Sequence, residues 1–496
     1  MFHIFLLQYV MPPVEVEEDV PPIWYAEDSM KAAEAWEALY SFPGLIGYSY
    51  GSFADMSGVS VKGGHPKGTA VYLEGLLINQ PQGGYADLSD ISTFLFSRAE
   101  VWEGGTTPYS IYGNLNFKYV PDTSGYVCVG SEGSLRGGAK LGGLGVDAGR
   151  ATRGKGVLLY AEGFWTGKYG KIDVRIARKR TSGMDDFPST SGLQEDLRVA
   201  AATPVGSILL LSREWEDWTG RYVHRNFRLS RNVSVRGLLV GLALEGVKST
   251  NVGSHLRPIL SVGKDAAVGN LYISGGIWTD TRRLGYSAAV GFRKDKAYAQ
   301  LLLSNRIPSF DELFWEGYMA RGNPDLRNEK SFGGSVGWIS DILKLDLFYR
   351  RMYDLIEWEP VRGIWMPKNV PGGRVWGWSL GLRYGWLSLK YDRLWAYDDE
   401  GHRLIYRPRN TYHVRLSPSL GPVSLALEGT YIDPRFTNRA NTRFVNYVLL
   451  IEPSLAYSLG RLSVVVSVFN LLNGRYEFVE GYTLPGRSVS LTLHLR

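Results

Sequence analysis

Two short segments near the N-terminus carry side chains suited to ligand binding. Both combine aromatic rings with hydroxyl, amide or carboxylate groups, a chemistry in which rings stack on a ligand while polar groups fix its orientation. We therefore predict ligand-binding loops at 48–55 and 79–87, with ordinary turn chemistry as the alternative interpretation. The candidate contact residues are Tyr48, Ser49, Tyr50, Ser52, Phe53, Asp55, Asn79, Gln80, Gln82 and Tyr85.

Motifs that would indicate an enzyme are weak. The segment from Gly47 to Gly51 formally fits G-x-S-x-G. A nucleophile elbow needs a strand before it and a helix after it, whereas here a helical pattern precedes and a Gly-rich segment follows. The sequence contains no H-E-x-x-H and no Walker A pattern. We therefore expect a protein that is not an enzyme and needs no cofactor.

One acidic segment has side chains that Ca²⁺ prefers. Asp185 and Asp186 lie close to Glu195 and Asp196, and Ca²⁺ binds several carboxylate oxygens at once. The spacing is not that of an EF-hand loop. Ca²⁺ binding by Asp185 and Asp186 is therefore a hypothesis, and a solvated loop is the alternative.

The composition indicates which elements position these loops. The 496 residues include 59 Gly, 15 Trp, 30 Tyr and 19 Phe, which suits many short strands with tight turns and interfacial rings. The net charge of +6 is small for a nucleic-acid binder, and the single cysteine, Cys128, precludes an internal disulfide. Apolar runs are too short for a transmembrane helix.

Apolar and polar residues alternate with period two beyond about residue 123. Leu343, Leu345 and Leu347 alternate with Lys344 and Asp346, and comparable patterns recur to the C-terminus. Such alternation gives a strand one apolar and one polar face. Charged residues in the middle of strands, with Trp and Tyr near the strand ends, favour a membrane β-barrel over a large soluble β protein.

The N-terminal quarter follows another pattern. Residues 29–45 predict a helix that Ser29 can cap and that Pro43-Gly44 ends. Short strands are expected at 59–61, 70–73, 76–78 and 97–102, separated by Gly-rich turns. This region is therefore predicted to be a small α/β globular unit. The hydrophobic start, 1–11, fits either a mis-started signal peptide or a plain hydrophobic N-terminus.

Several motifs, in order, resemble TonB-dependent outer-membrane receptors of the cobalamin and siderophore type. The plug-like motifs are Phe42-Pro43-Gly44, 59–64 (VSVKGG), 71–75 (VYLEG) and 98–101 (RAEV); the barrel-like motifs are 306–313 (RIPSFDEL) with 322–330 (GNPDLRNEK), and 469–476 (FNLLNGRY) with 481–487 (GYTLPGR). Three positions depart from the pattern. Lys62 replaces the usual Arg, Glu103 stands where a basic residue is common, and Arg496 replaces a terminal aromatic.

The resemblance implies a fold and a mode of action. It implies a 22-stranded antiparallel barrel at 123–496, a plug at 29–122, and an extended segment at 1–28 that contains a TonB box. The candidate TonB box is Val14, Glu15, Val16, Glu17 and Glu18, flanked by Pro pairs that keep the segment extended. Arg98 and Glu100 are interpreted as plug-to-barrel electrostatics, because half-buried charges need partners.

The implied function is import of a scarce metal chelate, such as cobalamin or a siderophore. The expected protein is a monomer in the bacterial outer membrane, in contact with lipid, powered by TonB and binding no nucleic acid. A passive porin-like channel with a constricting N-terminal domain is the alternative, and an adhesive or structural protein is a third. With 22 strands, about 17 residues remain for each strand and its connection, of which roughly 9–11 span the bilayer. We therefore expect short loops and little extracellular cover over the plug.

Overall fold

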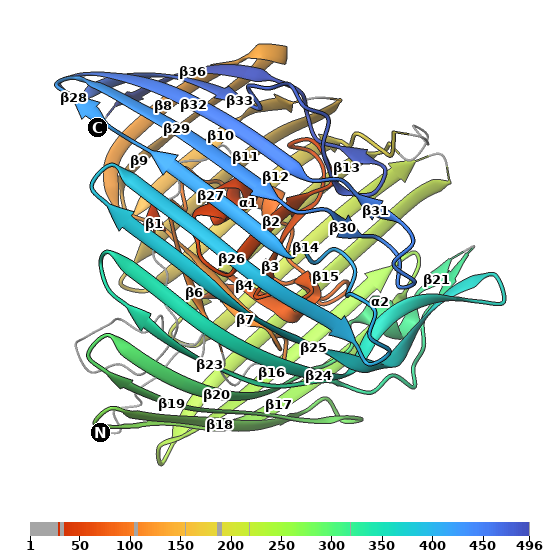
Figure 1. Cartoon of the computed structure of the whole chain (residues 1–496). Coiled ribbons are helices and arrows are strands. Elements are labelled where there is room, and N and C mark those ends of the chain that lie inside the picture. Colours follow the sequence, from red (N-terminus) through yellow and green to blue (C-terminus); the bar gives the residue numbers. More distant parts are fainter. Residues whose placement is uncertain are drawn as a thin grey trace.

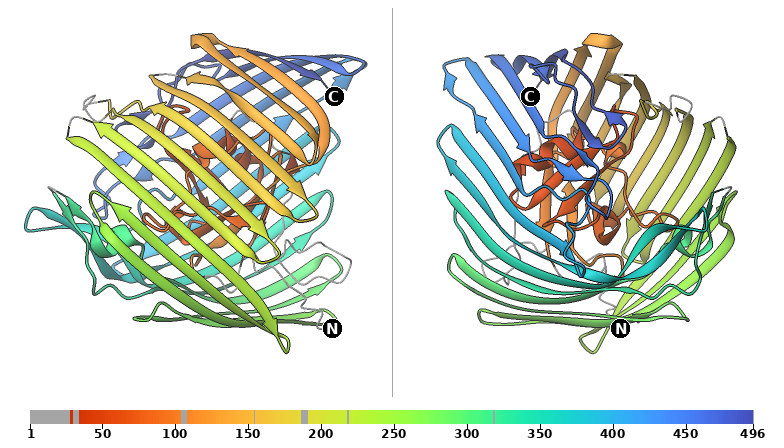
Figure 2. Two further views of the ribbon diagram at one scale, coloured as in Figure 1. Left: turned by 180° about the vertical axis from the view of Figure 1, so that it is seen from behind. Right: turned by 45° about the vertical axis from the view of Figure 1, so that its right-hand side comes forward.

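The computed structural model describes residues 28–29, 34–103, 108–153, 155–185, 191–217, 219–317 and 319–495. The candidate TonB box at 14–18, the hydrophobic start at 1–11, Asp186 and Arg496 lie outside these residues. Within the described residues, a closed β-barrel surrounds a small N-terminal unit, the plug, drawn in red and orange (Figures 1 and 2). No helix among them is long and apolar enough to cross a membrane.

Among the described residues, 22 antiparallel strands form the barrel wall, and β36 pairs with β8 to close it. They are β8 (Asp122–Gly130), β9 (Ser134–Gly142), β10 (Leu144–Arg153), β11 (Gly156–Gly167), β12 (Gly170–Arg180), β13 (Leu193–Thr203), β14 (Gly206–Asp217), β15 (Gly220–Val235), β16 (Leu238–Ser249), β17 (Gly253–Val268), β18 (Leu271–Thr279), β19 (Leu284–Lys294), β20 (Ala297–Arg306), β23 (Glu329–Ile339), β24 (Leu343–Val361), β25 (Ile364–Tyr384), β26 (Leu387–Asp398), β27 (Asn410–Leu416), β29 (Val423–Ile432), β32 (Val448–Leu459), β33 (Leu462–Phe469) and β36 (Ser488–Leu495). The predicted barrel is confirmed.

The alternation of side chains places charges inside the barrel and apolar groups outside. On β24, Asp346 lies opposite Ser379 of β25, and each is 1% exposed. The next pair, Leu347 and Trp378, faces outward, and Leu347 is 48% exposed. Exposed rings also lie at strand ends, as Tyr384 does at the end of β25 and Trp386 does in the turn that follows. The outer face is therefore a lipid-facing surface with aromatic rings along its border.

The plug contains a five-stranded mixed sheet in the order β1-β6-β7-β4-β5. Its strands are β1 (Asp28–Ser29), β4 (Thr69–Leu73), β5 (Leu76–Leu77), β6 (Arg98–Trp102) and β7 (Gly113–Lys118), and a separate hairpin joins β2 (Leu45–Ser49) to β3 (Ser57–Val61). Short 3₁₀ turns lie at η2 (Pro66–Gly68) and η3 (Leu88–Asp90). The expected short strands therefore form. The plug sheet ends at Lys118 and the barrel begins at Asp122.

The predicted helix is shorter than expected and starts later. Helix α1 covers only Ala35–Ala38, and the 3₁₀ turn η1 (Leu39–Ser41) follows it. Ser29 does not cap it, because Ser29 pairs with Arg98 in the sheet. Glu34 takes the N-cap position and forms a capping box with Glu37. The sheet edge thus competes with the helix for the residues before position 34.

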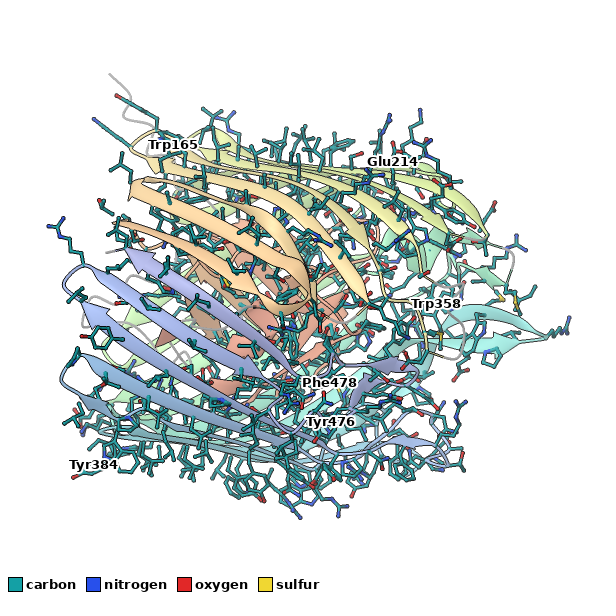
Figure 3. The ribbon with its side chains drawn as sticks, turned by 90° about the horizontal axis from the view of Figure 1, so that it is seen from above. Trp165, Glu214, Trp358, Tyr384, Tyr476 and Phe478 are labelled. Carbon is teal, nitrogen blue, oxygen red and sulfur yellow. The ribbon has the colours of Figure 1, made fainter. Side chains whose placement is uncertain are left out.

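The two ends of the barrel differ in the length of their connections. At one end, neighbouring strands are joined by tight turns such as Gly142–Leu144 and Val235–Leu238. At the other end, connections are longer at 181–192, 307–328, 399–409, 433–447 and 470–487. Trp165 and Tyr384 lie toward the first end and Trp358 toward the second (Figure 3). We refer to the second end as the loop end.

The longer connections carry structure of their own. They contain α2 (Phe310–Phe314), β21 (Glu316–Gly317), β22 (Ala320–Arg321), β30 (Arg435–Phe436), β31 (Phe444–Val445), β34 (Glu477–Val479) and β35 (Tyr482–Thr483). The short β8–β9 connection is η4 (Ser131–Gly133), and β28 (Ser419–Leu420) lies at the turn end. Loops 307–328 and 470–487 fold inward onto the plug, as the next section describes. The expectation of little cover over the plug is therefore wrong, because average loop length does not reveal an uneven distribution.

Candidate ligand-binding site

The predicted loop at 79–87 lies under a connection from the loop end. In helix α2, Phe310 and Asp311 donate their backbone N–H groups to the carbonyls of Pro81 and Gln82, over 3.4 and 2.8 Å. From the wall strand β15, the side chain of Asn226 accepts a hydrogen bond from the N–H of Gln82 at 3.0 Å. The tip of this loop is therefore held between α2 and the barrel wall.

Within this loop, the side chains of Asn79 and Gln82 contact other groups of the protein. Asn79 is 1% exposed; its Oδ1 accepts from the N–H of Val71 at 2.7 Å, and its Nδ2 donates to the carbonyl of Thr69 at 2.9 Å. The side chain of Gln82 lies 3.1 Å from the ring nitrogen of His224. These bonds fix the loop's shape, and direct contact of either residue with a ligand stays a prediction.

The first predicted segment also contributes buried anchors. Ser52 donates its N–H and hydroxyl to the Asp55 carboxylate at 2.7 and 2.8 Å, and Asp55 accepts from the N–H of Ser182 in a barrel loop at 2.8 Å. Phe53 lies against the guanidinium groups of Arg136 and Arg153 on the wall. Ser49 is fully buried as well. These side chains attach the segment to the barrel.

Solvent reaches the remaining predicted residues, Tyr48, Tyr50, Gln80 and Tyr85, which are half-buried. The rings of Tyr48 and Tyr50 lie edge to face at 6.3 Å, and Tyr482 of loop 470–487 contacts Tyr50 at 5.1 Å. Burial raises the pKa of Tyr48, Tyr50 and Tyr85. They remain neutral phenols, able to stack and to donate hydrogen bonds.

Three basic residues near these rings were missed in the sequence. His65 and Lys67 lie on the turn between β3 and β4, and Arg407 comes from loop 399–409. Arg407 donates to the carbonyl of Gly63 at 2.8 Å and forms no ion pair with a described carboxylate within 4 Å. His65 is exposed at the surface, and desolvation of its ring by the surrounding groups, together with the charges of Arg407 and Lys67, lowers its pKa below the usual range. The Gly-Gly-His-Pro-Lys sequence at 63–67 was the available signal.

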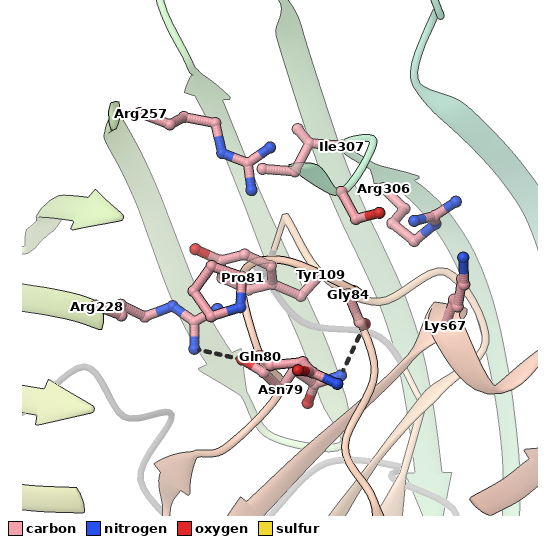
Figure 4. A pocket seen from close by; sticks show the side chains of 11 residues that line it. Lys67, Asn79, Gln80, Pro81, Gly84, Tyr109, Arg228, Arg257, Arg306 and Ile307 are labelled. Atoms are coloured by element: carbon pink, nitrogen blue, oxygen red, sulfur yellow. Dashed lines mark hydrogen bonds between the residues drawn. The ribbon is translucent and has the colours of Figure 1, made fainter. Parts of the chain in front are cut away.

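Further cations surround a small pocket beside loop 79–87. Its volume is about 10 Å³, and Lys67, Arg228, Arg257 and Arg306 line it together with Tyr109 (Figure 4). Each of the four cations has a carboxylate partner. Arg306 pairs with Glu312 and Glu329, Lys67 lies 3.5 Å from Glu312, and Glu245 binds Arg228 and Arg257. Four cations face three carboxylates, so the pocket has a positive balance.

The plug is attached to the wall by ion pairs that the sequence reading did not identify. Lys62 pairs with Asp346, and Glu103 pairs with Arg350, each over 2.6 Å and with nearly no exposure. Arg153 of β10 similarly pairs with Glu37 of helix α1. Opposite charges placed across an interface are the expected way to bury ionised groups.

A second group of ion pairs lies beneath loop 79–87. Lys179 of β12 lies 2.6 Å from Asp90 and 3.4 Å from Asp87, and Arg213 of β14 lies 3.5 Å from Asp90. Although burial raises the pKa of Asp90, the charges of Lys179, Arg175 and Arg213 outweigh it and lower that pKa. Asp90 is therefore ionised and holds the loop to the wall.

Arg98 and Glu100 lie on β6, between β1 and β7 in the plug sheet, and Arg98 is exposed. Glu100 accepts from Asn116 at 3.0 Å and lies 3.7 Å from Lys118, both on the neighbouring plug strand β7. These contacts stabilise the plug sheet itself. A role for the two residues between plug and barrel stays a prediction.

Two groups of side chains among the described residues contain carboxylates that could contact a cation. Asp185 is exposed, and Lys155 and Thr483 already engage its two oxygens. Elsewhere, Asp398, Glu400 and His402 have ligand atoms within 4.8 Å of one another. Arg439 pairs with both Asp398 and Glu400, which supplies positive charge at that place. Ca²⁺ binding by Asp185 and Asp186 stays a prediction.

Comparison with known proteins agrees with this architecture. Residues 241–471 match the family model of the TonB dependent receptor-like β-barrel. The matched part of the barrel belongs to this family. Members are outer-membrane transporters and not enzymes, and their energy comes from TonB, so the predicted location in the bacterial outer membrane and the predicted family are confirmed.

Solved structures of such receptors share the fold at low identity. The ferric enterobactin receptor PfeA from Pseudomonas aeruginosa aligns with a TM-score of 0.65 and 14% identity over 96% of this chain and 99% of that chain. The siderophore receptor PirA from Acinetobacter baumannii gives 0.65 and 12% over 95% and 98%. The iron transporter FrpB from Neisseria meningitidis gives 0.68 and 11% over 94% and 97%. No curated protein sequence matches.

Proposed function

We propose that this receptor binds an anionic ferric siderophore at the loop end and imports it with energy from TonB. The observation that carries the proposal is the cationic and aromatic surface at the plug apex. Arg407 has no carboxylate partner there among the described residues, and Lys67, Tyr50 and Tyr85 lie in the same region. Neutral phenols and cations together suit a negatively charged chelate with aromatic or hydroxyl groups.

The names of the similar structures support the choice of an iron chelate over cobalamin. PfeA, PirA and FrpB are described as a ferric enterobactin receptor, a siderophore receptor and an iron transporter. Their identity to this chain is 11–14%, so the ligand itself must be established by experiment. Cyanocobalamin is neutral, whereas a catecholate chelate such as ferric enterobactin is an anion, so the chelate would interact more favourably with the positive charge of Arg407.

A binding screen of the purified receptor tests the proposal. The probes are ferric enterobactin, a ferric hydroxamate, ferric citrate and cyanocobalamin, each measured with and without Ca²⁺ by isothermal titration calorimetry. We expect submicromolar binding of at least one ferric chelate and none of cyanocobalamin. Binding of cyanocobalamin alone would overturn the choice of ligand class. Binding of no probe, together with ion conductance in a planar bilayer, would favour the passive channel.

A further inference from the structure

Two cations lie directly opposite each other on the outer face of the barrel. In the register of β15 with β16, Arg225 is the partner of Lys248, and both side chains are exposed. On the same strands, Asn226 and Val247 are buried on the inner face, so the alternation turns Arg225 and Lys248 outward. Like charges in directly opposite positions of a sheet are destabilising, so this arrangement favours an anion bound between them.

Among the described residues, the protein itself supplies no such anion. No carboxylate there lies within 4 Å of either cation. Glu214 of β14 interacts electrostatically with Arg225 but forms its ion pair with Arg221. Another outward cation, Arg178 of β12, pairs with Glu195 at 3.4 Å. Arg225 and Lys248 are therefore available to an anion from outside the protein.

The position of the pair relative to the membrane follows from strand length. Ten residues separate Arg225 from Val235, at the turn end of β15, and ten separate Lys248 from Leu238, at the turn end of β16. Roughly 9–11 residues of a tilted strand cross the hydrocarbon core, and the short turns of outer-membrane barrels face the periplasm. The pair therefore lies at the outer boundary of the membrane, level with the lipid headgroups.

An apolar surface begins immediately below the pair. The next outward row toward the turn end is Phe227, Gly246 and Leu256, and the row after it contains Leu229 and Leu244. The ring of Phe227 covers the bare backbone of Gly246, since a Cβ there would overlap that ring and lie 2.9 Å from Cδ2 of Leu256. The three leucines are exposed. An apolar surface under two cations matches a molecule that has an anionic head and acyl chains.

We propose that Arg225 and Lys248 bind the headgroup phosphate of a lipid of the outer leaflet, whose acyl chains lie on the apolar surface below. Phosphate suits the pair because guanidinium and ammonium groups form charge-assisted hydrogen bonds with its oxygens. A soluble anion would leave the apolar surface uncovered, and an acidic protein could not reach below the membrane boundary. The site lies on the outer face of the barrel and is independent of the imported ligand.

Lipid binding by the purified receptor tests this proposal. The probe is diphosphoryl lipid A, and native mass spectrometry in detergent measures its Kd. Arg225→Gln with Lys248→Gln should raise that Kd at least fivefold. The matched control, Arg178→Gln with Arg221→Gln, also removes two outward charges, but each of these has a carboxylate partner, so the Kd should stay within twofold of wild type. The exchange Arg225→Lys with Lys248→Arg keeps both charges and should retain wild-type binding.

Two further probes distinguish a lipid from other anions. Dephosphorylated lipid A should bind the wild-type receptor at least fivefold more weakly, and its Kd should not change in the Gln double variant. The soluble disaccharide bisphosphate, which lacks acyl chains, should bind at least tenfold more weakly than lipid A.

Three results would overturn the proposal: unchanged binding in the Gln double variant, equal losses in that variant and its control, or equal binding of lipid A and either further probe. None of these results bears on siderophore import, which the calorimetric screen tests separately.

Discussion

Lys62 Nζ lies 2.6 Å from Glu103 Oε2, and both side chains are almost completely buried. These are two of the positions at which the sequence departs from the motifs of its family. The same network reaches the barrel, because Lys62 also pairs with Asp346 and Glu103 with Arg350. Burial raises the pKa of Glu103, but Lys62 and Arg350 outweigh burial and lower it. An acidic residue at position 103 is therefore matched by a basic one on β24.

We expect Glu103→Arg to weaken the seating of the plug. The substitution places a second cation against Lys62 and Arg350, and breaking a buried pair typically costs about 3–5 kcal/mol. Thermal unfolding in detergent should begin at a lower temperature, and a protease should cleave the plug faster. The matched control is Glu195→Arg, since Glu195 is 57% exposed and its pair with Arg178 contributes little.

The reciprocal exchange distinguishes charge from shape at this position. Glu103→Arg combined with Arg350→Glu restores one opposite pair across the interface and should recover most of the lost stability. If the double variant is as unstable as Glu103→Arg alone, the pairing does not determine how the plug is seated.

Neutralising the cations at the plug apex should weaken binding of ferric enterobactin. For Lys67→Gln and for Arg407→Gln we expect at least a tenfold rise in Kd, or about 1.4 kcal/mol. Added salt should narrow the difference from wild type, because exposed charges are screened. Titration calorimetry at two salt concentrations measures both effects. Arg178→Gln, on the outer face, is the control, and an equal loss of affinity there would contradict the assignment.

Loop 307–328 should hold the plug more firmly at acidic pH. Burial raises the pKa of Asp311 to about 7, and its Oδ1 is buried without a hydrogen-bond partner. A raised pKa in the folded state means that the stabilisation is full below pH 4 and is lost as pH rises through 7. Protection of the α2 amides against hydrogen exchange should therefore fall between pH 5 and 8, and Asp311→Asn should remove that dependence. An unchanged pH profile in this variant would exclude Asp311 as the cause.

Deletion of 12–20 should abolish uptake and leave ligand binding unchanged. This segment contains the candidate TonB box, and the plug apex that we assign to ligand binding begins well after it. Radioactive iron uptake in living cells and calorimetry on the purified variant measure the two properties separately. Replacing 14–18 with a Gly/Ser segment of equal length controls for the shortened tail, and normal uptake in that variant would place the TonB contact elsewhere.

The sequence predicted the wall of this protein better than its interior. Alternation assigned Asp346 to the inner face and Leu347 to the outer face, and the register of β24 with β25 confirms both. It did not predict that the side chain of Asn79 forms its hydrogen bonds with the plug backbone. Nor did it single out Lys67 or Arg407, which are far apart in the chain and meet only at the plug apex.

The sequence by itself determined the fold class, because a period of two and a membrane-length strand are local properties that each segment expresses alone. The order of its motifs also determined the family. Only the tertiary structure decided which charges pair and which loops cover the plug, because these contacts join residues hundreds of positions apart. Glu103 and Arg350 illustrate the difference, since each is an ordinary charged residue in the sequence and becomes half of a buried pair only when the barrel closes around the plug.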